Sequence, residues 1–167
     1  MGDMVYNTSS DIESHAITYL SQIFANSDLH TANDLANQHI PMLVTEADNL
    51  SLTTVPLMEE IKHVVIDLSN EVAPGPDGFP GHFYRHFWPI VQYDIIMSTQ
   101  YFFTNNYILS NMNSNQIVFI PKIPGADKLE NIRPIALANF QFKITTKILV
   151  DRHVKVASKI ISTQQRG

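Results

Sequence analysis

The sequence predicts an α+β fold that is mostly helical and contains one β-hairpin. Apolar residues recur at three- and four-residue spacing in several segments, which is the pattern of amphipathic helices. One short apolar run, residues 117–120, is β-branched and aromatic enough for a buried strand and too short for a helix. With 167 residues, 44% of them hydrophobic and 16% charged, the chain can form one ordinary domain or a part of one.

The first helix is expected to be capped by Ser9 or Ser10. Asp11 and Glu13 would then lie in its first turn, where the helix dipole favours acidic side chains. The residues of its apolar stripe predict one buried face: Ile12, Ala16, Tyr19, Leu20, Ile23 and Phe24. Asparagine and aspartate within residues 26–28 compete with the backbone for hydrogen bonds and are expected to end the helix.

Residues 29–52 predict mostly loop with one or two helical turns. Thr45 and Asp48 have the spacing of a small helix cap. A stronger helix is expected after Pro56, because Glu59 and Glu60 lie in its first turn and an apolar stripe comes next. That stripe consists of Ile61, Val64, Val65 and Leu68.

Residues 73–79 read APGPDGF and predict a stiff loop. Pro74 and Pro76 fix their φ angles, whereas Gly75 and Gly78 allow backbone angles and close approaches that other residues forbid. A stiff loop with bare backbone could hold a nucleic acid strand. The alternative is a rigid connector between two helices, and the loop by itself favours that alternative.

Helices are expected on both sides of Pro89. Pro80 can occupy the first position of a helix that runs through Trp88, where Pro89 interrupts or restarts it. The helix continues over residues 90–103 and is closed by the asparagines at 105–106. The aromatic residues of this region are expected in the core: Phe79, Phe83, Phe87 and Trp88.

His82 and His86 are four residues apart, as two metal ligands on one helix face would be. No third ligand at a suitable spacing follows, so solvated or stacking histidines are the favoured interpretation. The chain has no cysteine, which excludes disulfides and thiolate sites and fits a reducing, intracellular setting, nuclear or cytoplasmic. Neither a secretory signal nor a transmembrane run is found, so no membrane partner is expected.

The predicted hairpin presents two cations. A proline opens residues 121–130, which hold two prolines, a glycine and four charges and predict a solvated turn. Residues 132–136 return as a second extended piece, in which Pro134 predicts an edge strand or a strand end. The hairpin is therefore expected to bring Lys122 and Arg133 near one another, although an ordinary exposed pair would look the same in sequence.

A long final helix is expected after the hairpin. Its apolar positions are Phe142, Ile144, Ile148, Leu149, Val156 and Ile160. Its basic residues, which are expected to lie mostly off that stripe, are Lys143, Lys147, Arg152, Lys155 and Lys159. Residues 1–72 hold eleven acids and one base, whereas residues 73–167 hold ten bases and five acids. A basic half is typical of a protein that binds phosphates, but it also fits lysines and arginines that simply lie exposed to solvent on a helix face.

Several of these segments together resemble the reverse transcriptases of LINE-type retrotransposons, which lack terminal repeats, and plant members in particular. The matching strings are APGPDGF at 73–79, IPK at 120–122, RPIAL at 133–137, Asn139, FKI at 142–144, KIL at 147–149 and QRG at 165–167. They occur in the family's order. The resemblance implies an N-terminal helical extension over residues 1–52 and a partial reverse transcriptase domain, the fingers subdomain without its palm, over residues 53–167.

The resemblance also implies site residues and partners. Lys122 and Arg133 match the hairpin positions that touch the incoming nucleoside triphosphate in the family. Candidates for contact with the template strand are Pro74, Gly75, Pro76, Asp77, Gly78, Lys143, Lys147 and Arg152. The implied partners are an RNA template, a DNA primer, a deoxynucleoside triphosphate and a separate chain that supplies the palm.

The catalytic part of the family pattern is not found in these 167 residues. Reverse transcriptases hold two metal ions with aspartates in a Phe-Asp strand and a Tyr-Ala-Asp-Asp turn, and neither string occurs here. No catalytic or metal-binding residue is therefore assigned, and magnesium is expected only in a complete polymerase. We expect the chain to bind but not to polymerise. The alternatives are a helical interaction or nucleic-acid-binding protein derived from a decayed element, or a piece that has no stable fold alone.

Overall fold

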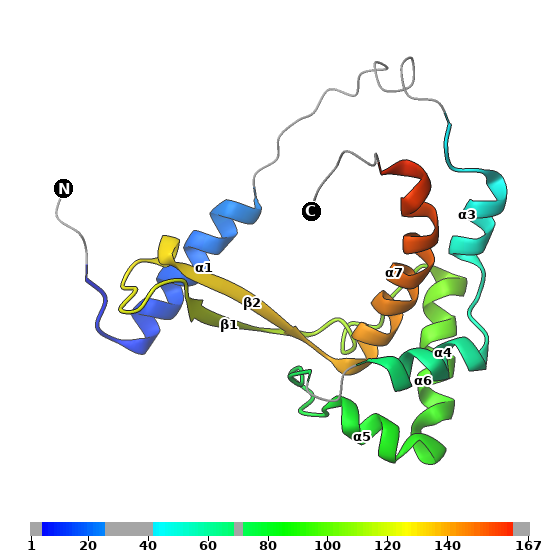
Figure 1. Ribbon diagram of the computed structural model, residues 1–167. Helices are drawn as coiled ribbons and strands as arrows, with labels where there is room; N and C mark the ends of the chain where they lie inside the picture. The colour runs from blue at the N-terminus through cyan, green and yellow to red at the C-terminus, as the bar shows by residue number, and fades with distance from the viewer. Residues whose placement is uncertain (1–4, 26–41, 69–71, 162–167) are drawn as a thin grey trace. The chain divides into compact units, whose positions relative to one another are not determined.

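The computed structural model describes residues 5–25, 42–68 and 72–161 and is mostly helical, with one two-stranded hairpin (Figure 1). The chain forms two compact units. The smaller comprises residues 1–40 and 119–134, and the larger comprises residues 41–118 and 135–167. The expected helix end at 26–28 lies outside the described residues, and the family boundary at residue 52 stays a prediction.

The larger unit is built around its last helix. Its helices are α3 (Glu46–Thr53), α4 (Met58–Asp67), α5 (Gly81–His86), α6 (Trp88–Asn105) and α7 (Phe140–Ile160). Helix α7 packs against α3, α4 and α6 (Figure 1). The buried core consists of Ile61, Val64, Val65, Tyr84, Ile95, Phe140, Ile144 and Ile148. The expected stripe of the helix after Pro56 is confirmed, since three of its members are buried in α4 and Leu68 packs against the core.

Local signals set the ends of these helices. The Thr45 hydroxyl accepts the backbone N–H of Asp48 at 3.2 Å, and the Asp48 carboxylate accepts the N–H of Thr45 at 3.0 Å, which completes a capping box. Pro80 precedes the first residue of α5 as its N-cap. Asn106 ends α6 in the left-handed conformation, with φ of 53°. The predicted cap at Thr45 and Asp48 and the asparagine stop are confirmed. A new helix does start beside Pro89, but the preceding helix ends at His86 rather than Trp88, and Pro80 is its N-cap rather than its first residue.

The expected aromatic core is only partly correct. The Phe79 and Phe87 side chains are 45% and 40% exposed, and Phe83 is half-buried against the core. Tyr84 takes the central place instead, with its ring stacked on Phe140 at 4.8 Å between centroids. The reason is the shortness of α5, whose six residues turn Gly81 and Tyr84, three positions apart, toward the interior.

Helix α7 also departs from its expected stripe. Ile144, Ile148 and Val156 are buried as predicted, whereas Ile160 is 52% exposed. Arg152 is 8% exposed and lies on the buried stripe, so placing it among the basic residues off the stripe was wrong. Its position follows from spacing, since it lies four residues from a buried residue on either side.

The smaller unit contains helix α1 (Ser9–Phe24) and the tip of the hairpin. The predicted cap at Ser9 or Ser10 was wrong by at least one residue, since the cap is Thr8, whose hydroxyl accepts the Asp11 N–H at 3.2 Å. The prediction of one fully buried face was wrong. Ala16 is buried, but Ile23 and Phe24 are 51% and 75% exposed. None of the helices within the described ranges has both the length and the apolar character to cross a bilayer.

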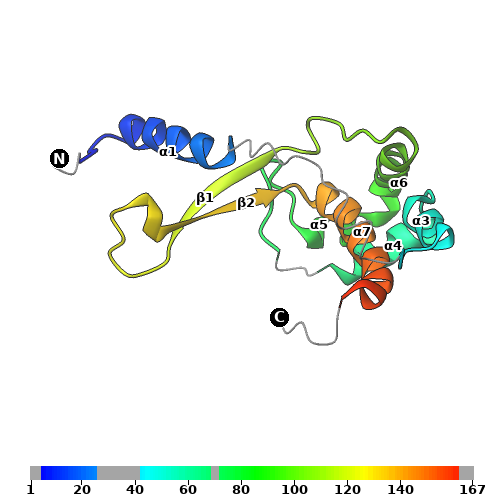
Figure 2. The same ribbon diagram turned by 90° about the horizontal axis from the view of Figure 1, so that it is seen from above.

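The hairpin consists of β1 (Asn115–Pro121) and β2 (Ile132–Ala138), joined by a turn that includes the short 3-10 helix Leu129–Asn131 (Figure 2). The predicted strand end at Pro121 is confirmed. The prediction of a buried first strand was wrong, because Ile117, Phe119 and Ile120 are 49%, 40% and 45% exposed. A sheet of two strands buries little on either face, however apolar its sequence.

Candidate nucleic-acid interface

The register of the hairpin follows from one bond and two equal strand lengths. The Lys122 N–H donates to the Asn131 carbonyl at 2.8 Å, so these residues face each other across the start of the turn. Counting back along both seven-residue strands pairs Ile120 with Arg133 and Phe119 with Pro134. Pro134 then occupies a non-hydrogen-bonded pair, where its missing N–H removes no bond from the ladder.

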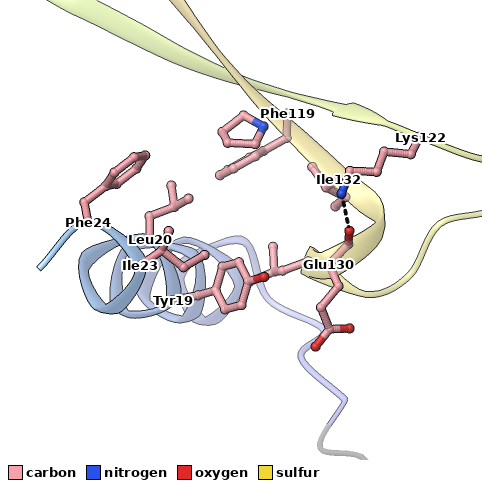
Figure 3. A pocket seen from close by; sticks show the side chains of 10 residues that line it. Tyr19, Leu20, Ile23, Phe24, Phe119, Lys122, Glu130 and Ile132 are labelled. Atoms are coloured by element: carbon pink, nitrogen blue, oxygen red, sulfur yellow. Dashed lines mark hydrogen bonds between the residues drawn. The ribbon is translucent and has the colours of Figure 1, made fainter. Parts of the chain in front are cut away.

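This register places Lys122 and Arg133 close together along the hairpin, but not on one face. Arg133 is two residues from Asn131, the residue opposite Lys122. Lys122 itself follows the last residue of β1, and its side chain lines a cavity under α1 with Phe119 and Pro134 (Figure 3). Both residues are exposed. The Lys122 ammonium donates to the Glu130 carbonyl at 2.6 Å (Figure 3). Among the described residues the Arg133 guanidinium has no hydrogen-bond or ion-pair partner, so all of its donors are open to a ligand.

Helix α1 packs over one face of the hairpin tip. The side chains that it contributes are Tyr19, Leu20, Ile23 and Phe24 (Figure 3). Opposite them lie Phe119, Ile132 and Pro134, which alternation assigns to one face of the strands. A cavity of about 180 Å³ remains between helix and hairpin. The packing is therefore incomplete, and α1 leaves the face that carries Arg133 open.

Three of the five backbone N–H groups of the APGPDGF loop donate within the protein. The Asp77 N–H donates to Asn139 Oδ1 at 3.2 Å, the Gly78 N–H to the Gly75 carbonyl at 3.0 Å, and the Phe79 N–H to Asp77 Oδ1 at 3.1 Å. Gly78 adopts a φ of 73°, which a residue with a side chain rarely takes. Since its prolines have no N–H, the contacts of the described residues leave only the N–H groups of Ala73 and Gly75 for a phosphate. This arrangement favours the rigid-connector interpretation of the loop.

Asn139 is the centre of that connector. It is 5% exposed, and its Nδ2 donates to the Asn111 carbonyl at 2.9 Å while its Oδ1 accepts from Asp77. A Cβ built on Gly75 would lie 2.4 Å from both the backbone N and the Oδ1 of Asn139, and 2.5 Å from the Ala138 carbonyl carbon. We call Gly75, Asp77, Asn111 and Asn139 the Asn139 joint. It connects three separate segments of the larger unit.

Lys143 extends this connection from α7 to the loop. Its Nζ donates to the Ala73 carbonyl at 2.7 Å. Burial lowers the pKa of Lys143, and the nearby Asp77 carboxylate acts in the opposite direction. Asp77 also accepts a long hydrogen bond of 3.4 Å from the Tyr84 hydroxyl, whose pKa is raised by burial and by this carboxylate. The Lys143 ammonium thus binds the loop through one of its three donors, and the remaining donors can bind a ligand.

Arg152 is engaged entirely by the protein. Its Nε and Nη2 bind the two carboxylate oxygens of Glu60 at 2.9 and 2.8 Å, and its Nη1 donates to the carbonyls of Leu52 and Thr54 at 3.1 and 2.5 Å. The guanidinium also lies 4.9 Å from the centroid of the Phe103 ring. The bidentate pair joins α7 to α4, and the two carbonyl bonds join α7 to the end of α3, so Arg152 has a structural role here.

The remaining lysines of α7 differ in their engagement. Lys147 forms an ion pair with Asp151 one turn along the helix. Lys159 donates to the Asp48 carboxylate of α3 at 2.6 Å, and this bond, with those from Thr45, lowers the pKa of Asp48 to about 2. Lys155 is exposed, and no described residue pairs with its ammonium.

Sequence reasoning missed most of these partners. An asparagine between a strand and a helix signals an N-cap, and Asn139 does hold that position. Its side chain makes no capping bond and is used for tertiary contacts instead. Nothing in the local sequence of Asn111 or Glu60 indicates the carbonyl or carboxylate that each supplies, because both partners are distant along the chain.

The described residues provide no ready metal centre. Across residues 5–25, 42–68 and 72–161, no group of three or more histidine, cysteine, aspartate or glutamate side chains is placed to hold an ion. His82 and His86 are exposed, and the His86 ring packs edge-on against Phe87. These residues therefore do not fit the carboxylate site that polymerase magnesium needs. The sequence matches no protein-family model.

Proposed function

We propose that this chain is the fingers part of a LINE-type reverse transcriptase, and that its hairpin holds the triphosphate of an incoming nucleotide. The observation that carries the proposal is the pair of exposed cations, Lys122 and Arg133, close together at the tip of the hairpin. Arg133 can bind a phosphate through two parallel hydrogen bonds, and Lys122 adds a point charge beside it. This is the chemistry that a triphosphate requires.

The Asn139 joint gives separate support. Asp77 and Asn139 belong to two of the strings that carry the family resemblance, and they are 62 residues apart in sequence. In the structure they meet at 3.2 Å, and Gly75 fits because it has no side chain. A physical contact between them explains why both strings would occur in one chain.

The proposed role is binding rather than bond formation. Transfer of a nucleotide needs two metal ions and an activated primer hydroxyl, for which aspartates outside these 167 residues would be required. The residues of this chain would fix the triphosphate and neutralise part of its charge. A palm-bearing partner, whether in the same or another polypeptide, would complete the polymerase.

The test is binding of the purified chain to a labelled RNA/DNA hybrid and to a deoxynucleoside triphosphate, measured by fluorescence anisotropy across a salt series. Lys122→Ala and Arg133→Ala should each weaken binding and reduce the slope of log K against log salt by about one. Lys62→Ala is the matched control, since it removes the same charge from the acidic half of the chain. It should leave both quantities unchanged.

A second candidate function is protein interaction without nucleic acid. It is favoured by the apolar side chains exposed on the smaller unit, including Ile23, Phe24 and Ile120 at 51%, 75% and 45%. If affinity for the hybrid is absent, or is insensitive to both Lys122→Ala and Arg133→Ala, the fingers proposal is refuted and this candidate takes its place.

A further inference from the structure

The two outer edges of the hairpin are not equivalent. In an antiparallel pair, residues alternate between those bonded to the partner strand and those whose backbone groups point outward. With Lys122 and Asn131 as a bonded pair, the outward residues of β1 are Asn115, Ile117, Phe119 and Pro121. Those of β2 are Ile132, Pro134, Ala136 and Ala138. Each edge can therefore be judged by the groups that it presents.

The edge of β2 is closed at two places. Pro134 has no N–H to offer a third strand. The carbonyl carbon of Ala138 lies 2.5 Å from where a Cβ of Gly75 would be, so the APGPDGF loop occupies the end of this edge. Proline and a covering loop are common ways in which proteins protect an exposed strand.

The edge of β1 is closed only at its end, where Pro121 has no N–H to offer. Asn115, Ile117 and Phe119 each present an outward N–H and carbonyl, and within the described residues the sheet ends at this strand. The strand carries no charge, and its apolar side chains are 40% to 49% exposed at Phe119, Ile120 and Ile117. Helix α1 packs on the face of the tip that carries Phe119, Ile132 and Pro134. An open, uncharged apolar edge is a template for another strand.

We propose that β1 pairs with β1 of a second copy of this chain, antiparallel about a twofold axis at Ile117. This register sets Ile117 opposite Ile117 and Asn115 opposite Phe119, using the three outward residues of each copy. No like charges meet, because the strand has none. The product is a four-stranded sheet in place of a two-stranded one, which is marginally stable alone. The inference does not depend on the proposed nucleotide-binding function.

The first experiment is sedimentation equilibrium of the full chain and two proline variants. Ile117→Pro removes an outward N–H and leaves the hairpin ladder intact. Because the twofold axis repeats the substitution in both copies, two hydrogen bonds are lost. The dissociation constant of the dimer should therefore rise roughly thirtyfold. Ala136→Pro is the control. It removes an outward N–H from the edge that is already closed, so the dissociation constant of its dimer should equal that of the unchanged chain.

A second experiment distinguishes the loss of dimerisation from the misfolding of a variant. Ile117→Lys and Ile117→Glu should each be monomeric, since the axis sets like charges face to face. An equimolar mixture of the two should form a heterodimer that weakens with added salt. The proposal is overturned by a chain that stays monomeric at hundreds of micromolar, by equal effects of the two proline variants, or by a mixture that fails to associate.

Discussion

Gly75→Ala is the sharpest test of the Asn139 joint. The added methyl group would lie 2.4 Å from the backbone N and the Oδ1 of Asn139, and 2.5 Å from the Ala138 carbonyl carbon. Two of these three atoms belong to the backbone at the point where β2 ends and α7 begins, so they cannot rotate away as the end of a side chain could. The loop must move out, which breaks the bond from the Asp77 N–H to Asn139.

The expected cost combines two contributions. Forcing an extra methyl group into a packed site costs about 1–3 kcal/mol, and the lost hydrogen bond adds about 1 kcal/mol. Gly75→Ala should therefore lower the free energy of unfolding by about 2–4 kcal/mol. Urea denaturation followed by circular dichroism measures this directly, and with an m-value of about 2 kcal/mol/M the midpoint should fall by about 1–2 M.

Gly78→Ala in the same loop is the matched control. Gly78 has a φ of 73°, but a Cβ there would meet no atom within 4 Å. Its substitution should cost only the backbone strain of a left-handed alanine, about 1 kcal/mol. If Gly75→Ala proves no more destabilising than Gly78→Ala, the close approach to Asn139 does not exist in solution and the joint is refuted.

Two further predictions concern the ion pairs of α7. Arg152→Ala should lower the free energy of unfolding by about 3 kcal/mol, because it leaves Glu60 without its bidentate partner, and a loss below about 1 kcal/mol in urea denaturation would contradict this. The Asp48 pKa is lowered from 3.8 to about 2, so its contribution to stability is present above about pH 4 and is lost as the pH falls toward 2. Asp48→Asn should flatten that part of the stability curve in acid titrations, whereas a curve that falls as steeply as before would exclude the Lys159–Asp48 pair as its cause.

The sequence predicted the elements well because their signals are local. The capping box at Thr45 and Asp48, the stop of α6 at Asn106 and the proline at the end of β1 each act within four residues. Such features depend on backbone angles and nearby donors, which one stretch of sequence contains in full. The hairpin that carries Lys122 and Arg133 was predictable for the same reason.

Burial was predicted poorly because it depends on what covers a residue. The apolar run of β1 was expected in a core, yet Ile117 is 49% exposed in a two-stranded sheet. Arg152 was expected off the apolar stripe, yet it is buried because Glu60 and two distant carbonyls satisfy it. The partners of Asn139 are likewise distant in sequence, so neither composition nor periodicity could indicate the joint.

The division of charge along the sequence therefore overstates the cations that are available to a nucleic acid. Acids of the first half neutralise bases of the second, as Glu60 does for Arg152 and Asp48 for Lys159. Among the described residues, Arg133 and Lys155 have no partner for their charged groups. If these pairs persist on binding, the salt dependence should correspond to about two to four phosphate contacts rather than ten. A slope near ten would mean that the ion pairs of α7 open on the nucleic acid, and that the surface is formed by binding.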